Sequence, residues 1–290
     1  MAVKDSMRLL KNTAGKWQQD NAAQAAAALA FYTMFSLAPL VIIATGVAGI
    51  IFGNEVAQRE LFAQIRRVAG PQAARLGYSA VENMSSGGKG VWGTVIGAVA
   101  LFVGATTVFA QLQTALNRMW KIRPRPGQAM LNLIRARLTA FVMVLLVGGL
   151  LLALLVFSAV LSAAAKYMAQ YTPGAKALMG VADVLVSLSV VTVLFAAIFR
   201  YLPDARIRWR DVWVGAGLTA FLFTLGKVLL GVYFAYSTLA SVYGAAGSLV
   251  ILLLWVYFSA QILLFGAEFT YVYASQHGTP VQPATHAEPA

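Results

Sequence analysis

The sequence contains no cysteine, only two histidines, and few charged residues. The absence of cysteine excludes disulfide bonds and thiolate metal sites. His277 and His286 both lie in a C-terminal segment rich in proline, alanine and polar residues. A histidine-based metal site within the rest of the chain is therefore excluded, and we predict neither a metal nor another cofactor.

Motifs for nucleotide hydrolysis and acyl transfer are also missing. A P-loop needs a glycine five residues before its Gly-Lys pair, and neither the GGKG segment at 87–90 nor Gly226-Lys227 has one. There is no G-x-S-x-G motif, and a Ser-His-Asp triad would have to take its histidine from the C-terminal tail. We therefore predict no catalytic residues, and an enzyme is the least favoured class.

Apolar residues, in contrast, are abundant and occur in long runs. They make up 60% of the chain, with 11% charged residues and a mean hydropathy of +0.73. A transmembrane helix needs about 20 mostly apolar residues. The sequence therefore predicts an all-α integral membrane protein with six transmembrane helices. The expected spans are 24–52, 91–117, 138–165, 179–200, 212–235 and 247–274.

The distribution of basic residues predicts the orientation. Most of the 22 lysine and arginine residues fall in the segment before the first span, between the second and third spans, and between the fourth and fifth. By the positive-inside rule, both termini of this multi-pass protein are predicted to be cytoplasmic. The net charge of +12 then indicates anionic lipid at the cytoplasmic leaflet rather than nucleic acid. Three spans in each half also permit a 3+3 inverted arrangement, although the halves show no sequence similarity.

Three segments lie outside the spans of the domain at 21–275. Residues 1–20 carry an apolar stripe beside lysines and arginine, which predicts an amphipathic helix on the cytoplasmic leaflet; the alternative is a helix packed under the bundle. The external loop at 53–90 has a helical pattern followed by a glycine-rich break. The tail at 276–290 is expected to be disordered and cytoplasmic.

Three ionisable residues stand out in the spans: Lys227, Glu268 and Asp183. Such residues usually face the bundle interior or a wet cavity. Lys227 is expected about 22 Å from the cytoplasmic end of its span, and Glu268 about 9 Å, so their direct pairing is not expected. Glu268 is better placed for Arg200 or for the basic loop after the second span. It is either a structural salt bridge or a site of substrate or proton coupling.

Further polar side chains could line a path through the bundle, or could simply join helices by hydrogen bonds and mark the membrane interfaces. They are Tyr32, Ser36, Gln111, Gln113, Asn117, Tyr233, Tyr236, Tyr243, Tyr257 and Gln261. Pro39 removes a backbone hydrogen bond and is expected to kink the first span, where freed carbonyl groups could meet a ligand.

Four segments together resemble the YihY/BrkB family of bacterial inner-membrane proteins. They are AAALAFYTMFSLAPL (26–40), YLPDARIRWRDVWVGA (201–216), LGKVLLGVYFAYS around Lys227, and VYGAAGSLVILLLWVYFSAQILLFGAEF (242–269). The positions that match include Tyr32, Ser36, Pro39, Leu202, Pro203, Trp209, Gly215, Lys227, Tyr233, Tyr243, Gly244, Trp255, Gly266 and Glu268. The resemblance covers nearly all of residues 1–275. The family has carried the label ribonuclease BN, which this chain does not support because it lacks a cluster of metal ligands.

The leading hypothesis is an inner-membrane transporter, such as a flippase or exporter of lipids or other amphipathic molecules. The resemblance implies lipid substrates, because some family members are linked to lipid or lipopolysaccharide export. Without an ATP motif, energy would come from an ion gradient or a partner, and a protonatable Glu268 suits proton coupling. The alternative is a non-transporting envelope scaffold that binds lipids or partner proteins. A homo-oligomer or an envelope protein partner is compatible with both.

Overall fold

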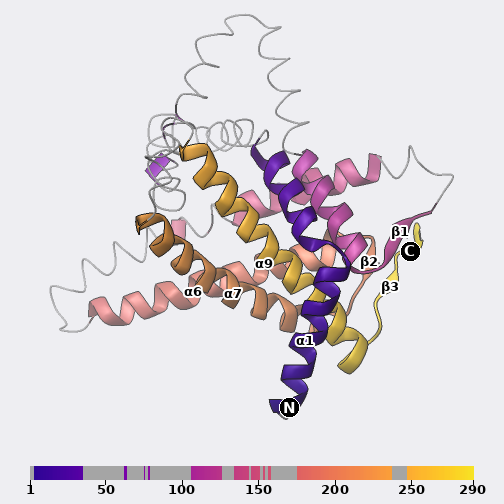
Figure 1. The fold of residues 1–290 in the computed structure, drawn as a ribbon. Helices are drawn as coiled ribbons and strands as arrows, with labels where there is room; N and C mark the ends of the chain where they lie inside the picture. Colours follow the sequence, from indigo (N-terminus) through magenta and orange to yellow (C-terminus); the bar gives the residue numbers. More distant parts are fainter. Residues whose placement is uncertain are drawn as a thin grey trace, which may run out of the picture.

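The computed structural model describes most of the helical framework of the chain. The described residues are 3–34, 62–63, 75, 78, 106–125, 134–143, 145–150, 153, 156–157, 175–236 and 247–290. The main helices are α1 (Val3–Gln19), α6 (Ala175–Tyr201), α7 (Trp209–Tyr236) and α9 (Gly247–His277). Residues 22–34, 106–119, 134–143 and 145–150 are also helical. Figure 1 shows α6, α7 and α9 together, with α1 crossing α9.

Three helices among the described residues are long and apolar enough to cross a membrane. These segments are Val184–Tyr201, Trp209–Phe234 and Leu249–His277, and they coincide with the last three expected spans. Only parts of the first three expected spans fall within the described residues, including the apolar helix Ala22–Met34. The protein is therefore mostly helical, and the full count of six spans and the orientation of the termini stay predictions.

Two glycine–threonine contacts bring α7 and α9 close together. A β-carbon at Gly215 would collide with the Thr270 side chain, and one at Gly266 would collide with Thr219. Each threonine hydroxyl donates to the glycine carbonyl one turn earlier on its own helix, at 2.7 Å, so no buried hydroxyl is left without a partner. Because Gly215 meets Thr270 and Thr219 meets Gly266, the two helices run antiparallel. This small-residue spacing permits close approach within a membrane.

A sharp corner separates α1 from the helix Ala22–Met34. Asn21 adopts a left-handed conformation (φ 51°), which asparagine tolerates better than most residues. Leu9 of α1 packs on Phe269 and Val272 of α9, while Met7 and Leu10 are exposed. The first helix thus uses one face to pack against the bundle and leaves an apolar edge free, which combines features of both interpretations of residues 1–20.

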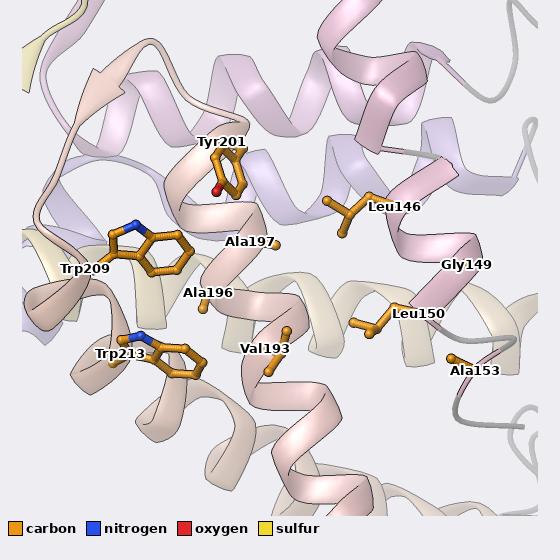
Figure 2. A pocket seen from close by; sticks show the side chains of 10 residues that line it. All are labelled: Leu146, Gly149, Leu150, Ala153, Val193, Ala196, Ala197, Tyr201, Trp209 and Trp213. Atoms are coloured by element: carbon orange, nitrogen blue, oxygen red, sulfur yellow. The ribbon is translucent and has the colours of Figure 1, made fainter. Parts of the chain in front are cut away.

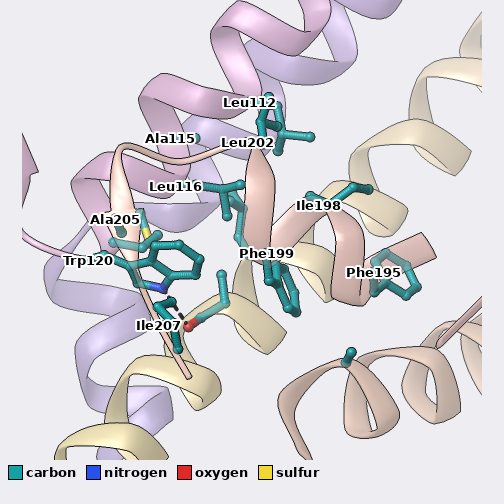
Figure 3. Close-up of a cluster of buried hydrophobic side chains, with 14 of the residues drawn as sticks. Leu112, Ala115, Leu116, Trp120, Phe195, Ile198, Phe199, Leu202, Ala205 and Ile207 are labelled. Atoms are coloured by element: carbon teal, nitrogen blue, oxygen red, sulfur yellow. Dashed lines mark hydrogen bonds between the residues drawn. The ribbon is translucent and has the colours of Figure 1, made fainter. Parts of the chain in front are cut away.

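The main buried cluster lies where α6 and the helix 106–119 meet α9. Trp120, Phe199, Leu116 and Leu202 are almost completely buried there (Figure 3). The Trp120 ring lies edge-on to Phe199, and its indole N–H donates to the Ala267 carbonyl at 3.0 Å. This cluster fixes the backbone of α9 next to Glu268.

The C-terminal tail corrects two predictions. Strands β3 (Gln282–Pro283) and β4 (Ala287–Pro289) pair antiparallel with β2 (Ala205–Arg206) and β1 (Ile122–Pro124), respectively. The tail was expected to be disordered and the fold purely helical. Instead, the tail forms backbone hydrogen bonds with two interhelical loops and buries Ala287, interactions that its polar composition alone does not reveal. We call the region formed by residues 118–125, 202–208 and 278–290 the basic end.

Candidate functional site

An apolar groove of about 410 Å³ runs between the helix 145–150, α6 and the start of α7. Figure 2 shows Tyr201, Trp209 and Trp213 around one flank and Leu146 and Leu150 on the other. The complete lining is Leu146, Gly149, Leu150, Ala153, Val193, Ala196, Ala197, Tyr201, Trp209 and Trp213. The three aromatic residues are between 41% and 53% exposed, so this flank of the groove is open among the described residues.

Basic side chains stand beside the aromatic flank of the groove. The guanidinium of Arg200 donates to the Ile207 carbonyl and lies 5.9 Å from the Trp209 ring centroid, within cation–π range. Arg206, Arg208 and Arg210 are exposed in and just after the adjoining loop. The groove therefore joins an apolar surface to positive charge, an arrangement that suits an amphipathic anion.

Glu268 lies in a second site, buried on α9, which packs against α1. Its side chain is fully buried (0% exposed), and neither carboxylate oxygen receives a hydrogen bond from the described residues. The charged groups around it are Asp20, Lys16 and Lys121. Lys121 belongs to the basic loop after the second expected span, so one of the two predicted neighbourhoods of Glu268 is present.

Asp20 connects this site to the corner after α1. Its side chain is 7% exposed, and one carboxylate oxygen forms an ion pair with Lys121. The other oxygen, Oδ2, has no hydrogen-bond partner among the described residues. Lys121 has a left-handed backbone (φ 55°), and Lys16 lies over the Tyr271 ring with Nζ 4.2 Å from its centroid.

A third polar cluster is centred on Asp204. Its Oδ2 accepts a hydrogen bond from Asn117 at 2.8 Å, and its Oδ1 accepts one from Gln113 at 3.2 Å. His286 of the tail lies 2.8 Å from Oδ1, and the Asp204 backbone N–H donates to the Asn117 side chain at 2.8 Å. Asp204 thus joins the helix 106–119, the loop before α7 and the tail.

The other predicted site residues do not gather around Glu268. Lys227 is exposed on α7 near Trp255 and Ser259, and it is not among the charged neighbours of Glu268, as expected from their different depths. Gln261 and Tyr32 are half-buried, and Tyr233 is exposed with its ring against Phe234.

The side chains of four more predicted residues lie outside what the structure describes. Asp183 lies in α6, where only the backbone of this residue is described. Ser36, Pro39 and Tyr243 lie outside the described residues, so the expected kink at Pro39 stays a prediction.

Two important acidic residues were absent from the predicted site. Asp20 directly precedes the first apolar run, and Asp204 sits within the YLPDAR segment at 201–206. Their positions next to expected spans could have marked them as candidates, because an acid beside a span needs a partner or water. Among the described residues, no group of three histidine or acidic side chains is placed to hold a metal ion.

Comparison with known proteins identifies the family. Residues 13–290 match the family model described as Virulence factor BrkB. A UPF0761 membrane protein of Pseudomonas paraeruginosa is 28% identical over 267 residues, which cover 91% of this chain and 62% of the relative. No solved structure matches.

Two further relatives give the same result. UPF0761 membrane proteins of Ralstonia nicotianae and Paraburkholderia xenovorans are each 29% identical, over 86% and 90% of this chain. The chain spans only 55% to 62% of the length of these three relatives. Because the family model covers nearly the whole sequence, the chain belongs to the BrkB family of membrane proteins.

Proposed function

We propose that this protein is an inner-membrane transporter that moves anionic lipids between leaflets or towards an export partner. The observation that carries the proposal is the apolar groove whose aromatic flank has Arg200 over Trp209, with exposed Arg208 and Arg210 next to Trp209 in the chain. The groove takes one acyl chain, and the arginines receive the lipid headgroup.

The size and lining of the groove support an acyl chain as its occupant. A volume of about 410 Å³ falls within the range of roughly 300–1,000 Å³ that is typical of ligand sites. Its lining is aliphatic and aromatic, so a polar solute would lose hydrogen bonds to water without replacement. An acyl chain loses none, and the open flank lets it enter sideways from the membrane.

The basic residues support a negatively charged headgroup. Arg206, Arg208 and Arg210 are exposed, and each can donate paired hydrogen bonds to phosphate oxygens. Tyr201, Trp209 and Trp213 form the aromatic flank of the groove (Figure 2), and Arg208 and Arg210 adjoin Trp209 in the sequence. Aromatic residues of this kind are favoured at the level of lipid headgroups.

The energy source in this proposal is an ion gradient or a partner protein. The sequence has no P-loop motif for ATP. Glu268 is the residue on which proton coupling would depend, because it is a fully buried ionisable group within an apolar helix.

A non-transporting scaffold that binds lipid is the alternative, and the close packing of the basic end favours it. The tail strands and the Asp204 cluster tie several segments together there. A scaffold would hold a lipid in the groove without moving it. Lipid binding is therefore expected under both proposals, and lipid movement under only one.

Lipid movement in reconstituted vesicles tests the proposal. The full chain is placed in vesicles that contain fluorescent phosphatidylglycerol, and the fraction of label that a membrane-impermeant quencher reaches is followed with time. We expect faster exposure of inner-leaflet label than in protein-free vesicles. Equal rates, with phosphatidylglycerol still retained on the purified protein, would support the scaffold instead.

Two adjacent glycines provide a matched pair of variants. A β-carbon at either Gly148 or Gly149 meets nothing within 4 Å, but only Gly149 lines the groove. Gly149→Trp is expected to slow lipid movement about tenfold, corresponding to the loss of about 1.4 kcal/mol of lipid binding. Gly148→Trp adds the same volume outside the lining and is expected to retain most of the rate. Equal loss in both variants would show that the groove is not the route.

A further inference from the structure

Glu268 is a buried acid that receives no hydrogen bond from the described residues. Its side chain is 0% exposed, and both carboxylate oxygens lack a partner among the described residues. A buried ionised carboxylate normally collects several hydrogen bonds or a close cation, because it has lost its hydration. The structure gives Glu268 neither as a direct partner. The charged groups around it include another acid, Asp20.

Only one of the two carboxylate oxygens of Asp20 has a partner among the described residues. Lys121 forms an ion pair with Oδ1, while Oδ2 is buried and has no partner in the described part of the chain. Asp20 is only 5% exposed, and its partner Lys121 directly follows Trp120, whose indole donates to the Ala267 carbonyl next to Glu268. If both groups were ionised, two negative charges would face each other and three buried oxygens would lack donors.

One proton removes the repulsion and gives two of these three oxygens a hydrogen-bond partner. A protonated carboxyl group has one O–H donor, and an ionised carboxylate accepts only. A proton on Glu268 can be donated to the free oxygen of Asp20, while Lys121 continues to balance the charge of Asp20. The repulsion between the two acids disappears at the same time.

We propose that Asp20 and Glu268 form a proton-binding site, in which one shared proton joins the corner after α1 to α9. The groups that face this pair are Lys16 from α1, Lys121 from the loop after the helix 106–119, and Tyr271 from α9 through its contact with Lys16. Release of the proton leaves two facing carboxylates, which draws the lysines inward and weakens the attachment of the corner to α9.

The surrounding contacts make α1, rather than α9, the element that responds. Trp120 donates to the Ala267 carbonyl at 3.0 Å, and Gly266 is locked against Thr219, so α9 is held on both sides of Glu268. The corner is held by the Asp20–Lys121 ion pair, by the Leu9 contact with Phe269 and Val272, and by the burial of Ala22 and Ala26 in the main cluster. This site stands independently of lipid transport, because it follows from the pairing of the two acids alone.

Infrared difference spectroscopy of the purified full chain tests the site without measuring transport. Protonated carboxyl groups absorb separately from carboxylates, and the band shifts in heavy water. We expect wild-type protein to show a protonated carboxyl band at neutral pH that Glu268→Gln removes. In Asp20→Asn, an amide donor replaces the facing charge, so the band is expected to disappear at a lower pH than in wild type.

Glu288→Gln is the matched control, because Glu288 is a partly exposed acid paired with Arg123 at 2.9 Å. It should leave the band unchanged. Absence of the band in folded wild-type protein would overturn the proposal, and so would its persistence in Glu268→Gln. If Glu268→Gln does not fold, an unchanged titration of the band in Asp20→Asn overturns it equally.

Discussion

Asp204 and Glu268 are both shielded acids, yet their surroundings are opposite. Asp204 has partners from two other segments: Gln113 and Asn117 on one helix and His286 in the tail. Glu268 is more deeply buried and receives no hydrogen bond from the described residues. The hydrogen bonds of Asp204 stabilise the packing of the segments that it joins. Glu268 receives none from the described residues, so we assign it a different role.

The contrast extends to what each acid joins. The Asp204 cluster closes the basic end, with the tail strands β3 and β4 lying over two loops. The Glu268 pair joins α9 to the corner after α1, next to which Ala22 and Ala26 pack into the main buried cluster. We therefore expect changes at Asp204 to affect stability first, and changes at Glu268 to affect protonation and transport first.

The largest stability effect is expected from Asp204→Ala. The variant leaves Asn117, Gln113 and His286 without their acceptor, and the loss of several hydrogen bonds to a charged group should cost about 3 kcal/mol. Equilibrium unfolding in mixed micelles provides the measurement. A loss below about 0.5 kcal/mol, the usual effect of a surface substitution, would mean that the cluster does not fasten the basic end.

Lys121→Met should have the next largest effect, about 1–2 kcal/mol, because it leaves the buried Asp20 without its ion-pair partner. Methionine retains an unbranched chain of similar length. Adding Asp20→Asn is expected to restore part of the loss, and the double-mutant cycle measures the coupling between the two residues. Strictly additive effects would contradict an interaction between them.

His286→Ala should lower the free energy of unfolding by about 1 kcal/mol through loss of its contact with Asp204. It should also expose residues 282–289 to faster backbone hydrogen exchange. His277→Ala is the control, because His277 lies at the exposed end of α9 and stacks on Tyr273 without touching the cluster. Equal exchange in both variants would show that His286 does not hold the tail.

Glu268→Gln is expected to have the smallest effect on stability, within about 0.5 kcal/mol of wild type. The amide has nearly the same shape as the protonated acid and retains a donor for Asp20. Asp204→Asn replaces an ionised acceptor and should be clearly less stable. If the order of these two isosteric variants is reversed, the distinction between the two acids is wrong.

The sequence predicted the last three spans because each is a long apolar run. It also predicted that Lys227 and Glu268 would not pair, since helix rise alone places them at different depths. The glycine–threonine contacts between α7 and α9 were missed, because Gly215 and Gly266 become meaningful only when the register of two helices is known.

The neighbours of Asp20 and Glu268 were also hard to predict, because they depend on how distant helices pack. Asp20 and Glu268 are separated by most of the chain, and only the packing of α1 on α9 brings them together. The tail was expected to be disordered because its composition is polar and rich in proline. Its order comes from pairing with β1 and β2, which are themselves too short to be recognised from a pattern.

Lipid movement measured as a function of pH tests most directly whether the buried pair, rather than the Asp204 cluster, serves transport. The measurement compares wild type, Glu268→Gln and Asp204→Asn in phosphatidylglycerol vesicles, with rates normalised to the amount of folded protein. We predict that the rate depends on pH in wild type and in Asp204→Asn, and that this dependence is lost in Glu268→Gln. The same pH profile in all three proteins would contradict the account, as would a wild-type rate equal to that of protein-free vesicles.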